Sequence, residues 1–239
     1  MGKPTVFRIA LDNPTAVYYA GQVVSGRVLL TAQKRIRYNG VRIEAVGRAD
    51  VHWTESETRR NHENRSSSRT VHYNSSEEYF NYRILLAQVS SGSSENEIPI
   101  GSHEYRFQFT LPTQCATSFQ STYGNIRYTL KAVIDRPWKF DHTSTLPFTV
   151  ISVFDLNYHD PSSSAPVEVT KSKTLGALFW KSGELKATLR LPQRGFVPGQ
   201  MMTPTLQIDN QSSKRVKHVK IYLKQQATYR AYRFHWKTK

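Results

Sequence analysis

Hydrophobic and polar residues alternate along much of the chain. The pattern is clearest in four runs, in which every second side chain is apolar: residues 7–11, 41–45, 105–111 and 126–132. Because successive side chains of a β-strand point to opposite faces, each run predicts a strand with one face in a core and the other in water. Turn-forming pairs such as Asn39-Gly40 separate the runs, and no amphipathic helix longer than a few turns is predicted. The sequence therefore predicts an all-β protein of the β-sandwich type.

Two segments interrupt the alternation. Residues 55–78 are polar throughout and rich in Ser, Asn and Arg, which predicts a long mobile loop or a hairpin extension rather than core. Residues 154–174 contain two prolines and a run of three serines, a composition typical of an interdomain linker. The expected organisation is an N-terminal domain, a linker and a C-terminal domain, at residues 1–153, 154–172 and 173–239.

The chain also contains an internal repeat. Gly21-Gln22 lies 178 residues before Gly199-Gln200, and at the same offset Val41-Arg42-Ile43 falls on Val219-Lys220-Ile221. The repeated glycine is expected to supply a turn conformation that a residue with a Cβ atom would resist. We infer two tandem copies of one β-sandwich plan.

The second copy is short. Only 67 residues remain from residue 173 to Lys239, whereas a sandwich of this kind needs about 100 residues and seven strands. At most four strands fit, so we expect the second domain to be incomplete and loosely folded in the monomer. Unpaired strand edges of this kind pair with other chains or aggregate.

Charge adds a candidate ligand class. The net charge is +15, and residues 151–239 carry 15 Lys/Arg against 5 Asp/Glu. A basic surface attracts phosphates of nucleic acid, anionic lipid or phosphorylated protein tails, and the alternative is a merely solubilising face. The chain has no apolar run of eighteen residues and no secretory signal, and its single cysteine, Cys115, allows no intramolecular disulfide. These features together predict a cytoplasmic protein.

Signals of catalysis are weak. The eight histidines form no pair at metal-site spacing, and the sequence has neither a phosphate-binding glycine loop nor a G-x-S-x-G motif. As a lone residue at a strand end, Cys115 is expected to be a small, partly buried side chain rather than a reactive thiol. We therefore expect no enzymatic activity, no cofactor and no metal site.

Several motifs, in order along the chain, resemble the arrestin-domain-containing proteins, or α-arrestins. They are YYAGQVVSGRVLL, VRIEAVGRADVHWTE, SFQSTYGNIRYTLKAVIDRP, FDLN and RGFVPGQ, at residues 18–30, 41–55, 118–137, 154–157 and 194–200. The resemblance covers nearly the whole chain. It implies two tandem arrestin-like, immunoglobulin-type β-sandwiches, of which the second is incomplete here.

The resemblance also implies a function. Proteins of this kind are cytosolic adaptors that bind the cytosolic tails of membrane receptors or transporters and couple them to ubiquitin ligases, endocytosis and endosomal sorting, with recruitment to the plasma membrane and endosomes. The chain departs from the family in having no Pro-Pro pair, and therefore no Pro-Pro-x-Tyr motif for direct docking of WW domains. Residues 173–239 contain no cysteine, so thioredoxin binding is not carried over.

Basic residues near the start of the chain are the candidate partner site. In the arrestin fold, basic side chains on and near the first strands of the N-terminal domain bind phosphates of a cargo tail. Guanidinium groups suit this role because they make paired, charge-assisted contacts to phosphate oxygens. The matching residues are Arg8, Lys34, Arg35 and Arg37. The alternative for all four is a solvated face.

The last segment, residues 214–239, contains nine Lys/Arg and no acid, interleaved with aromatic residues that include Phe234 and Trp236. It could be a nucleic-acid stacking surface, a membrane-surface patch or a core strand carrying Val219, Ile221 and Leu223. We expect the core strand and no specific nucleic acid, with peripheral membrane association allowed. The rival functions are a basic nucleic-acid-binding β protein and a truncated regulatory scaffold without cargo-sorting activity.

Overall fold

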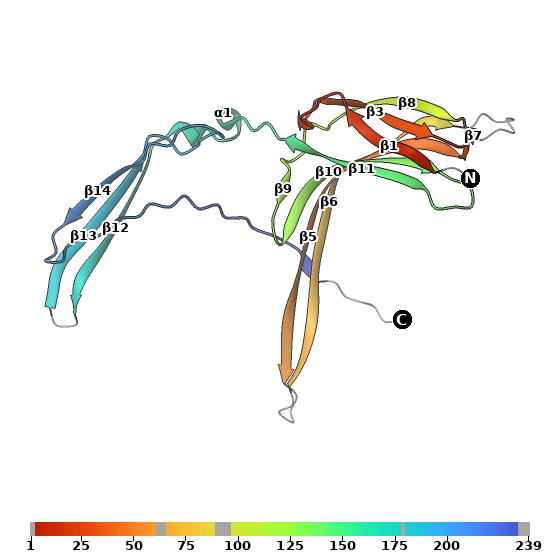
Figure 1. Cartoon of the computed structure of the whole chain (residues 1–239). Helices are drawn as coiled ribbons and strands as arrows, with labels where there is room; N and C mark the ends of the chain where they lie inside the picture. The colour runs from red at the N-terminus through yellow and green to blue at the C-terminus, as the bar shows by residue number, and fades with distance from the viewer. Residues whose placement is uncertain (1–2, 61–65, 89–96, 178–179, 234–239) are drawn as a thin grey trace. The chain divides into compact units, whose positions relative to one another are not determined.

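The structure is a computed structural model that describes residues 3–60, 66–88, 97–177 and 180–233. The chain divides into two compact units (Figure 1). The first contains residues 1–153 together with 227–239, and the second contains residues 154–226. In the part that is described, nearly all regular structure is β, which confirms the expected fold class.

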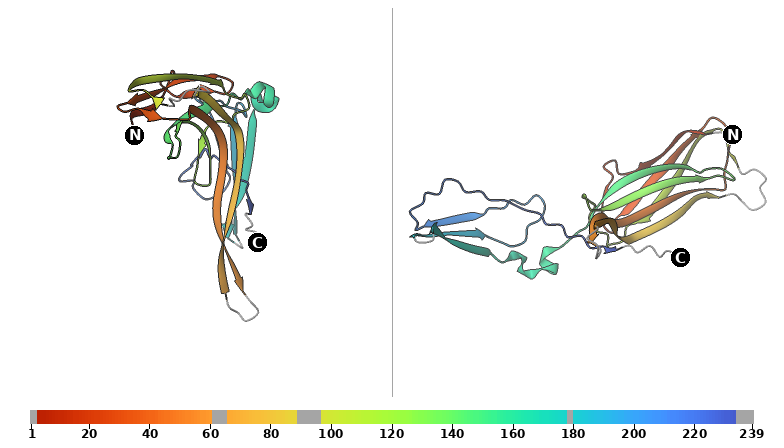
Figure 2. Two further views of the ribbon diagram at one scale, coloured as in Figure 1. Left: turned by 90° about the vertical axis from the view of Figure 1, so that its right-hand side faces the viewer. Right: turned by 90° about the horizontal axis from the view of Figure 1, so that it is seen from below.

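The first unit is built from two main sheets that stack face to face (Figure 1 and Figure 2). The smaller sheet has the order β1-β3-β8, formed by Pro4–Leu11, Val23–Ala32 and Gly101–Thr110. The larger has the order β15-β6-β5-β10-β11-β2, with β9 (Phe119–Gln120) beside β10. Its other strands are Tyr232–Arg233, Ser66–Gln88, Gly40–Arg60, Gly124–Asp135, His142–Ile151 and Val17–Tyr19. A short pair, β4 (Ile36–Arg37) and β7 (Glu97–Ile98), closes one end.

The core lies between the two sheets. The four alternating runs form parts of β1, β5, β8 and β10, as predicted, and their apolar positions face inward. Both sheets contribute to one cluster of buried side chains that includes Val24, Val28, Ile43, Tyr128 and Leu130. A second, smaller cluster fills the end beside β4 and β7. Period-two alternation therefore locates the core positions correctly in this unit.

The polar segment 55–78 forms the outer part of a long hairpin, so the hairpin alternative is the correct one. Strands β5 and β6 stay in register from Gly40 opposite Gln88 out to Arg60 opposite Ser66, with two irregularities. The hairpin extends well past the other strands of the unit (Figure 1). Cross-strand pairs stabilise it where there is no core, for example the stacked rings of Trp53 and Tyr73 at 5.3 Å.

The second unit contains one three-stranded antiparallel sheet in the order β12-β13-β14. Its strands are Val167–Ala177, Trp180–Leu191 and Thr205–Asn210. A short helix, α1 (Leu156–His159), a 3₁₀ turn (Pro161–Ser164) and the start of β12 occupy the segment expected to be a linker. None of the hydrophobic side chains described in this unit is fully buried.

The final segment differs from the expected core strand. No strand forms between residues 211 and 231, and the side chains of Val219, Ile221 and Leu223 are exposed. An extended segment gains strand hydrogen bonds only beside another strand, and none is placed beside these residues. Residues 227–233 belong instead to the first unit, where β15 pairs with β6. Phe234 and Trp236 lie outside the described residues.

The repeated Gly-Gln turn is the same in both copies. Gly21 has φ +87° and Gly199 has φ +86°, a conformation that favours glycine. In the first copy the Gln22 side-chain oxygen accepts a hydrogen bond from the Tyr19 N–H at 2.8 Å. In the second, the Gln200 oxygen accepts one from the Val197 N–H at 3.1 Å. The turn conformation expected from the repeat is confirmed at both glycines.

Candidate functional site

Strand β1 forms one of the two edges of the smaller sheet, and β8 forms the other. Strand β1 pairs with β3 on one side, and within the described ranges no strand pairs with its other side. Such an edge presents unpaired N–H and C=O groups, to which an extended peptide can add through main-chain hydrogen bonds. Arg8 is exposed on this strand, whereas its neighbour Ile9 is buried in the core. The edge therefore combines a main-chain binding strip with an outward guanidinium group.

A cationic corner follows β3. Lys34, Arg35 and Arg37 are all exposed, while Ile36 between the two arginines is 1% exposed. Ile36 and its strand partner Ile98 belong to the buried cluster at this end of the sandwich. Because one residue of a short strand is anchored in the core, its two neighbours must point outward.

One carboxylate serves both arginines of this corner. Arg35 Nη1 lies 3.6 Å from Glu97 Oε2, and Arg37 Nε donates to Glu97 Oε1 at 3.2 Å. Lys34 makes no ion pair with any described residue. Three cations against one anion leave a local excess of positive charge, and exposed pairs of this kind are weak enough to exchange for another anion. The corner can therefore accept phosphate or carboxylate oxygens.

The structure brings three of the four candidate residues together and leaves the fourth apart. Pro4, at the start of β1, pairs with Ala32, two residues before Lys34. Arg8 lies four residues further along β1, about 13 Å at the usual rise of a strand. Arg8 is thus a second contact point along the edge of β1, and it has no ion-pair partner in the described chain.

Sequence reasoning missed an exposed aromatic turn at the same end of the unit. Trp138 and Phe140 lie in the turn between β10 and β11, with relative exposures of 102% and 98%. Figure 1 shows this turn at the end of the unit that carries β7 and the start of β1. The sequence signal for this exposed turn was the stretch RPWKF, in which two aromatic residues stand beside basic residues at a strand end. Hydrophobic alternation alone assigns such aromatic residues to a core.

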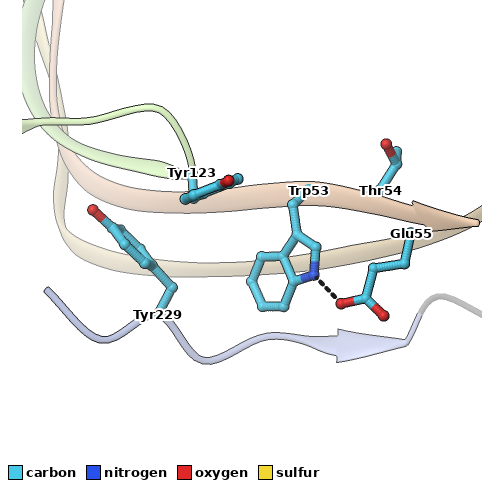
Figure 3. Close-up of a pocket in the computed structure, with 5 residues that line it drawn as sticks. All are labelled: Trp53, Thr54, Glu55, Tyr123 and Tyr229. Atoms are coloured by element: carbon cyan, nitrogen blue, oxygen red, sulfur yellow. Dashed lines mark hydrogen bonds between the residues drawn. The ribbon is translucent and has the colours of Figure 1, made fainter.

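A second feature missed from sequence is an aromatic groove of about 410 Å³ beside the long hairpin (Figure 3). Trp53, Thr54 and Glu55 come from β5, and Tyr123 and Tyr229 complete the lining. The Trp53 indole N–H donates to Glu55 Oε1 at 2.9 Å, and the rings of Tyr123 and Tyr229 meet edge to face at 5.8 Å. The Tyr229 hydroxyl donates to Ser121 Oγ at 2.6 Å.

The thiol of the single cysteine lies in the core of the first unit. Cys115 is fully buried, and burial raises the pKa of its thiol. Within the described residues there is no group of three or more His, Cys, Asp or Glu side chains that could hold a metal ion. Exposed cations, a free strand edge and aromatic side chains are groups suited to binding.

Comparison with known proteins assigns the fold to a family. The model for "Arrestin (or S-antigen), N-terminal domain" matches residues 7–157, about three-fifths of the chain. The chain belongs to the arrestin family. The model for "Arrestin (or S-antigen), C-terminal domain" matches residues 181–238 of this arrestin chain. The two matches follow one another as the internal repeat predicts.

Curated relatives place this arrestin chain among the α-arrestin-like proteins. It is 32% identical to Arrestin domain-containing protein 17 of Caenorhabditis elegans, over 95% of this chain and 53% of the relative. It is 31% identical to Arrestin domain-containing protein 4 of Homo sapiens, over 86% of this chain and 48% of that relative. Thioredoxin-interacting protein of Homo sapiens is 29% identical to it, over 88% of this chain and 51% of that relative. The chain spans about half the length of these relatives.

Several solved structures also match the chain. One of them, the sporulation control protein Spo0M from Bacillus subtilis, aligns over 87% of this chain and 90% of that one, at 10% identity and a TM-score of 0.35. Among the described residues of the arrestin chain itself, no helix has both the length and the apolar character needed to cross a membrane.

Proposed function

We propose that this chain is a non-enzymatic adaptor of the α-arrestin type. It recognises the cytosolic tails of membrane receptors or transporters and links them to ubiquitination, endocytosis and endosomal sorting. The observation that carries the proposal is the free edge of β1 with Arg8 beside it, in a chain that belongs to the arrestin family. The adaptor acts in the cytoplasm and is recruited to the plasma membrane and endosomes with its cargo.

Recognition occurs by addition of an extended tail to the edge of β1. Main-chain hydrogen bonds hold the tail, while Arg8 and the corner of Lys34, Arg35 and Arg37 select tails that carry phosphate or carboxylate groups. The chain already uses strand addition elsewhere, because the two residues of β15 add to the outer edge of β6.

Charge reversal at the edge and at the corner tests this mechanism. The probe is a labelled synthetic tail peptide with three phosphoserines, compared with its unphosphorylated form by fluorescence anisotropy. We expect Arg8→Glu and the double variant Arg35→Glu/Arg37→Glu each to weaken binding of the phosphorylated peptide at least tenfold, because each removes cations and adds repulsion. The control is Lys186→Glu, which has the same charge change as Arg8→Glu at an exposed position of β13 and should change the affinity less than twofold.

Two results would argue against the proposal. The first is equal binding of the phosphorylated peptide by all four proteins. The second is proximity labelling in cells that recovers no membrane receptor, transporter, ubiquitin ligase or endocytic protein. Tighter binding of a labelled oligonucleotide, with a steep loss between 50 and 200 mM salt, would favour the nucleic-acid-binding rival.

A further inference from the structure

The turn between β10 and β11 exposes two large aromatic side chains completely. Trp138 and Phe140 have relative exposures of 102% and 98%, and neither makes a ring contact with a described residue. An aromatic side chain of this size can remove 150–250 Å² from water when it packs, and folding normally uses that gain. Trp138 also has φ +59°, in the left-handed region that residues with a side chain seldom adopt. The local structure therefore presents this pair outward rather than burying it.

The base of the turn is held by hydrogen bonds and ion pairs. The Asp135 carbonyl accepts from the Asn39 N–H at 2.8 Å, and the Asp135 carboxylate accepts from Asn39 Nδ2 at 3.1 Å. Arg42 reaches both acids of the turn, with Nη1 3.6 Å from Asp135 Oδ2 and Nη2 3.8 Å from Asp141 Oδ2. The Arg136 N–H donates to Asp141 Oδ1 at 3.2 Å. Arg42 is shared with Glu44, whose Oε1 lies 2.9 Å from Arg42 Nε, so these contacts hold both acids at the base of the turn without cancelling their charge in full.

The other charged side chains of the turn, Arg136 and Lys139, are positive. Arg136 Nη1 lies 2.9 Å from His142 Nε2. Burial, and then the charges of Arg136 and Lys3, lower the pKa of His142, so its ring is neutral at pH 7 and accepts from the guanidinium. Lys139, between the two aromatic residues, is exposed and makes no ion pair in the described chain. The tip thus carries two aromatic rings and two cations, with both acids paired beneath them.

The cationic corner lies at this same end of the unit. Asn39, which holds Asp135, is two residues after Arg37, and β10 and β5 stay paired as far as Asp135 opposite Gly40. Figure 1 shows the β10–β11 turn and the β7 end on the same side of the sandwich. The positive charges of Lys34, Arg35 and Arg37 therefore lie at the same end of the unit as the aromatic tip.

We infer that the β10–β11 turn is an interfacial membrane anchor, in which Trp138 and Phe140 enter the headgroup region of an anionic bilayer while Arg136 and Lys139 contact lipid phosphates. Tryptophan prefers the membrane–water interface, and basic side chains beside it are attracted by anionic lipid. A protruding tip with aromatics at its apex and cations around it fits a flat surface with phosphates above and hydrocarbon below. A protein partner would instead need a matching pocket for two rings at once.

The inference does not depend on the proposed recognition of cargo, because a pure lipid vesicle contains no protein tail. Arg8 lies about 13 Å along β1 from this end and is not part of the anchor. An Arg8→Glu variant that loses phosphopeptide binding is therefore expected to keep its binding to vesicles. The two proposals can fail separately.

Vesicle binding by the full chain provides the test. Vesicles of phosphatidylcholine alone are compared with vesicles that contain about 30% phosphatidylserine, by co-sedimentation at fixed salt. We expect binding to the anionic vesicles, and a loss of at least tenfold in Trp138→Ser/Phe140→Ser because the inserting side chains are removed. Lys139→Gln removes one charge near the surface and is expected to cost roughly fivefold. Urea unfolding of each variant verifies that the fold is retained.

The matched control is Tyr222→Ser/Leu223→Ser, which removes an exposed apolar pair between Lys220 and Lys224 of the second unit. It should keep binding within twofold. A second readout uses Trp138→Phe, which keeps an aromatic ring: it should retain binding within about threefold but reduce the quenching of tryptophan fluorescence by brominated lipid.

Three outcomes would overturn the inference. The unsubstituted chain could fail to bind either kind of vesicle. The Trp138→Ser/Phe140→Ser variant could bind as well as the unsubstituted chain. Finally, the control variant alone could lose binding, which would place the membrane contact in the final basic segment of the chain instead.

Discussion

Cys115 is buried beside Tyr128 in the core of the first unit. The Tyr128 hydroxyl donates to the Ala116 carbonyl at 2.6 Å, which holds the ring beside the β8–β9 loop that carries the cysteine. Burial raises the pKa of the thiol, so the thiolate, the form that reacts, is scarce at neutral pH. Burial also raises the pKa of the neighbouring Tyr128 hydroxyl.

Cys115 is therefore expected to react slowly with a thiol reagent in the native chain. Labelling with a maleimide at pH 7 should be at least about a hundredfold slower than in urea, because both access and thiolate fraction are reduced. The chain contains one cysteine, so mass spectrometry reads the labelled fraction directly. Rapid labelling of the native chain at the same rate as in urea would contradict the buried position.

The Gly-Gln turn is the element in which sequence repeat and structure agree most closely. In both copies the glycine has positive φ, and the glutamine side chain binds the N–H three residues before it. The surroundings differ. A Cβ atom on Gly21 would lie 3.3 Å from Thr113 Cγ2, whereas one on Gly199 would meet nothing within 4 Å. The turn is therefore specified by local conformation, and only the first copy adds a tertiary contact.

Gly21→Ala should destabilise the first unit by about 1–2 kcal/mol, the usual cost of left-handed backbone for a residue with a Cβ atom. The measurement is the free energy of unfolding from a urea titration. Gly40→Ala is the control, because Gly40 has no positive φ and its added Cβ would make only ordinary contacts at 3.5 Å. It should change the free energy by less than about 0.5 kcal/mol. Equal effects of the two substitutions would show that backbone conformation is not the cause.

At the scale of the whole molecule, burial separates the two units. Every fully buried hydrophobic side chain in the described residues belongs to the first unit, from Ile9 to Val150. The buried residues described in the second unit are Ser163 and Thr188, both polar. Apolar side chains of its sheet, such as Val169 and Ile208, remain substantially exposed. A sheet with so little apolar burial has a weak driving force for ordering its backbone.

Hydrogen exchange should separate the units in the same way. Amides of β5 and β10 are expected to exchange at least about a hundredfold more slowly than those of β12, β13 and β14. Limited proteolysis should leave a stable fragment that ends near residues 154–174. Equal protection of both units in a demonstrated monomer would contradict the prediction, whereas protection of β12–β14 only in a dimer would mean that a second copy covers the open face.

The sequence by itself determined the local properties of this protein. Period-two alternation located parts of β1, β5, β8 and β10 and their buried positions, since the direction of successive side chains follows from backbone geometry alone. The repeat identified both turn glycines, because positive φ is a property of a single residue. The ordered motifs indicated the arrestin family, because each motif is a short run of residues that needs no tertiary contact to be recognised. The cluster from Lys34 to Arg37 remains a predicted partner site.

Only the tertiary structure decided how distant residues meet. Glu97 contacts Arg37 across sixty residues of sequence, and no local pattern assigns that carboxylate to the arginines. Alternation could not show that Trp138 and Phe140 point into solvent, because their exposure depends on Arg42 and Asn39 holding the base of the turn. Alternation also assigned Val219 and Ile221 to a core strand, yet they form none. A strand exists only where a neighbour supplies its hydrogen bonds, and the placing of neighbours is a property of the whole fold.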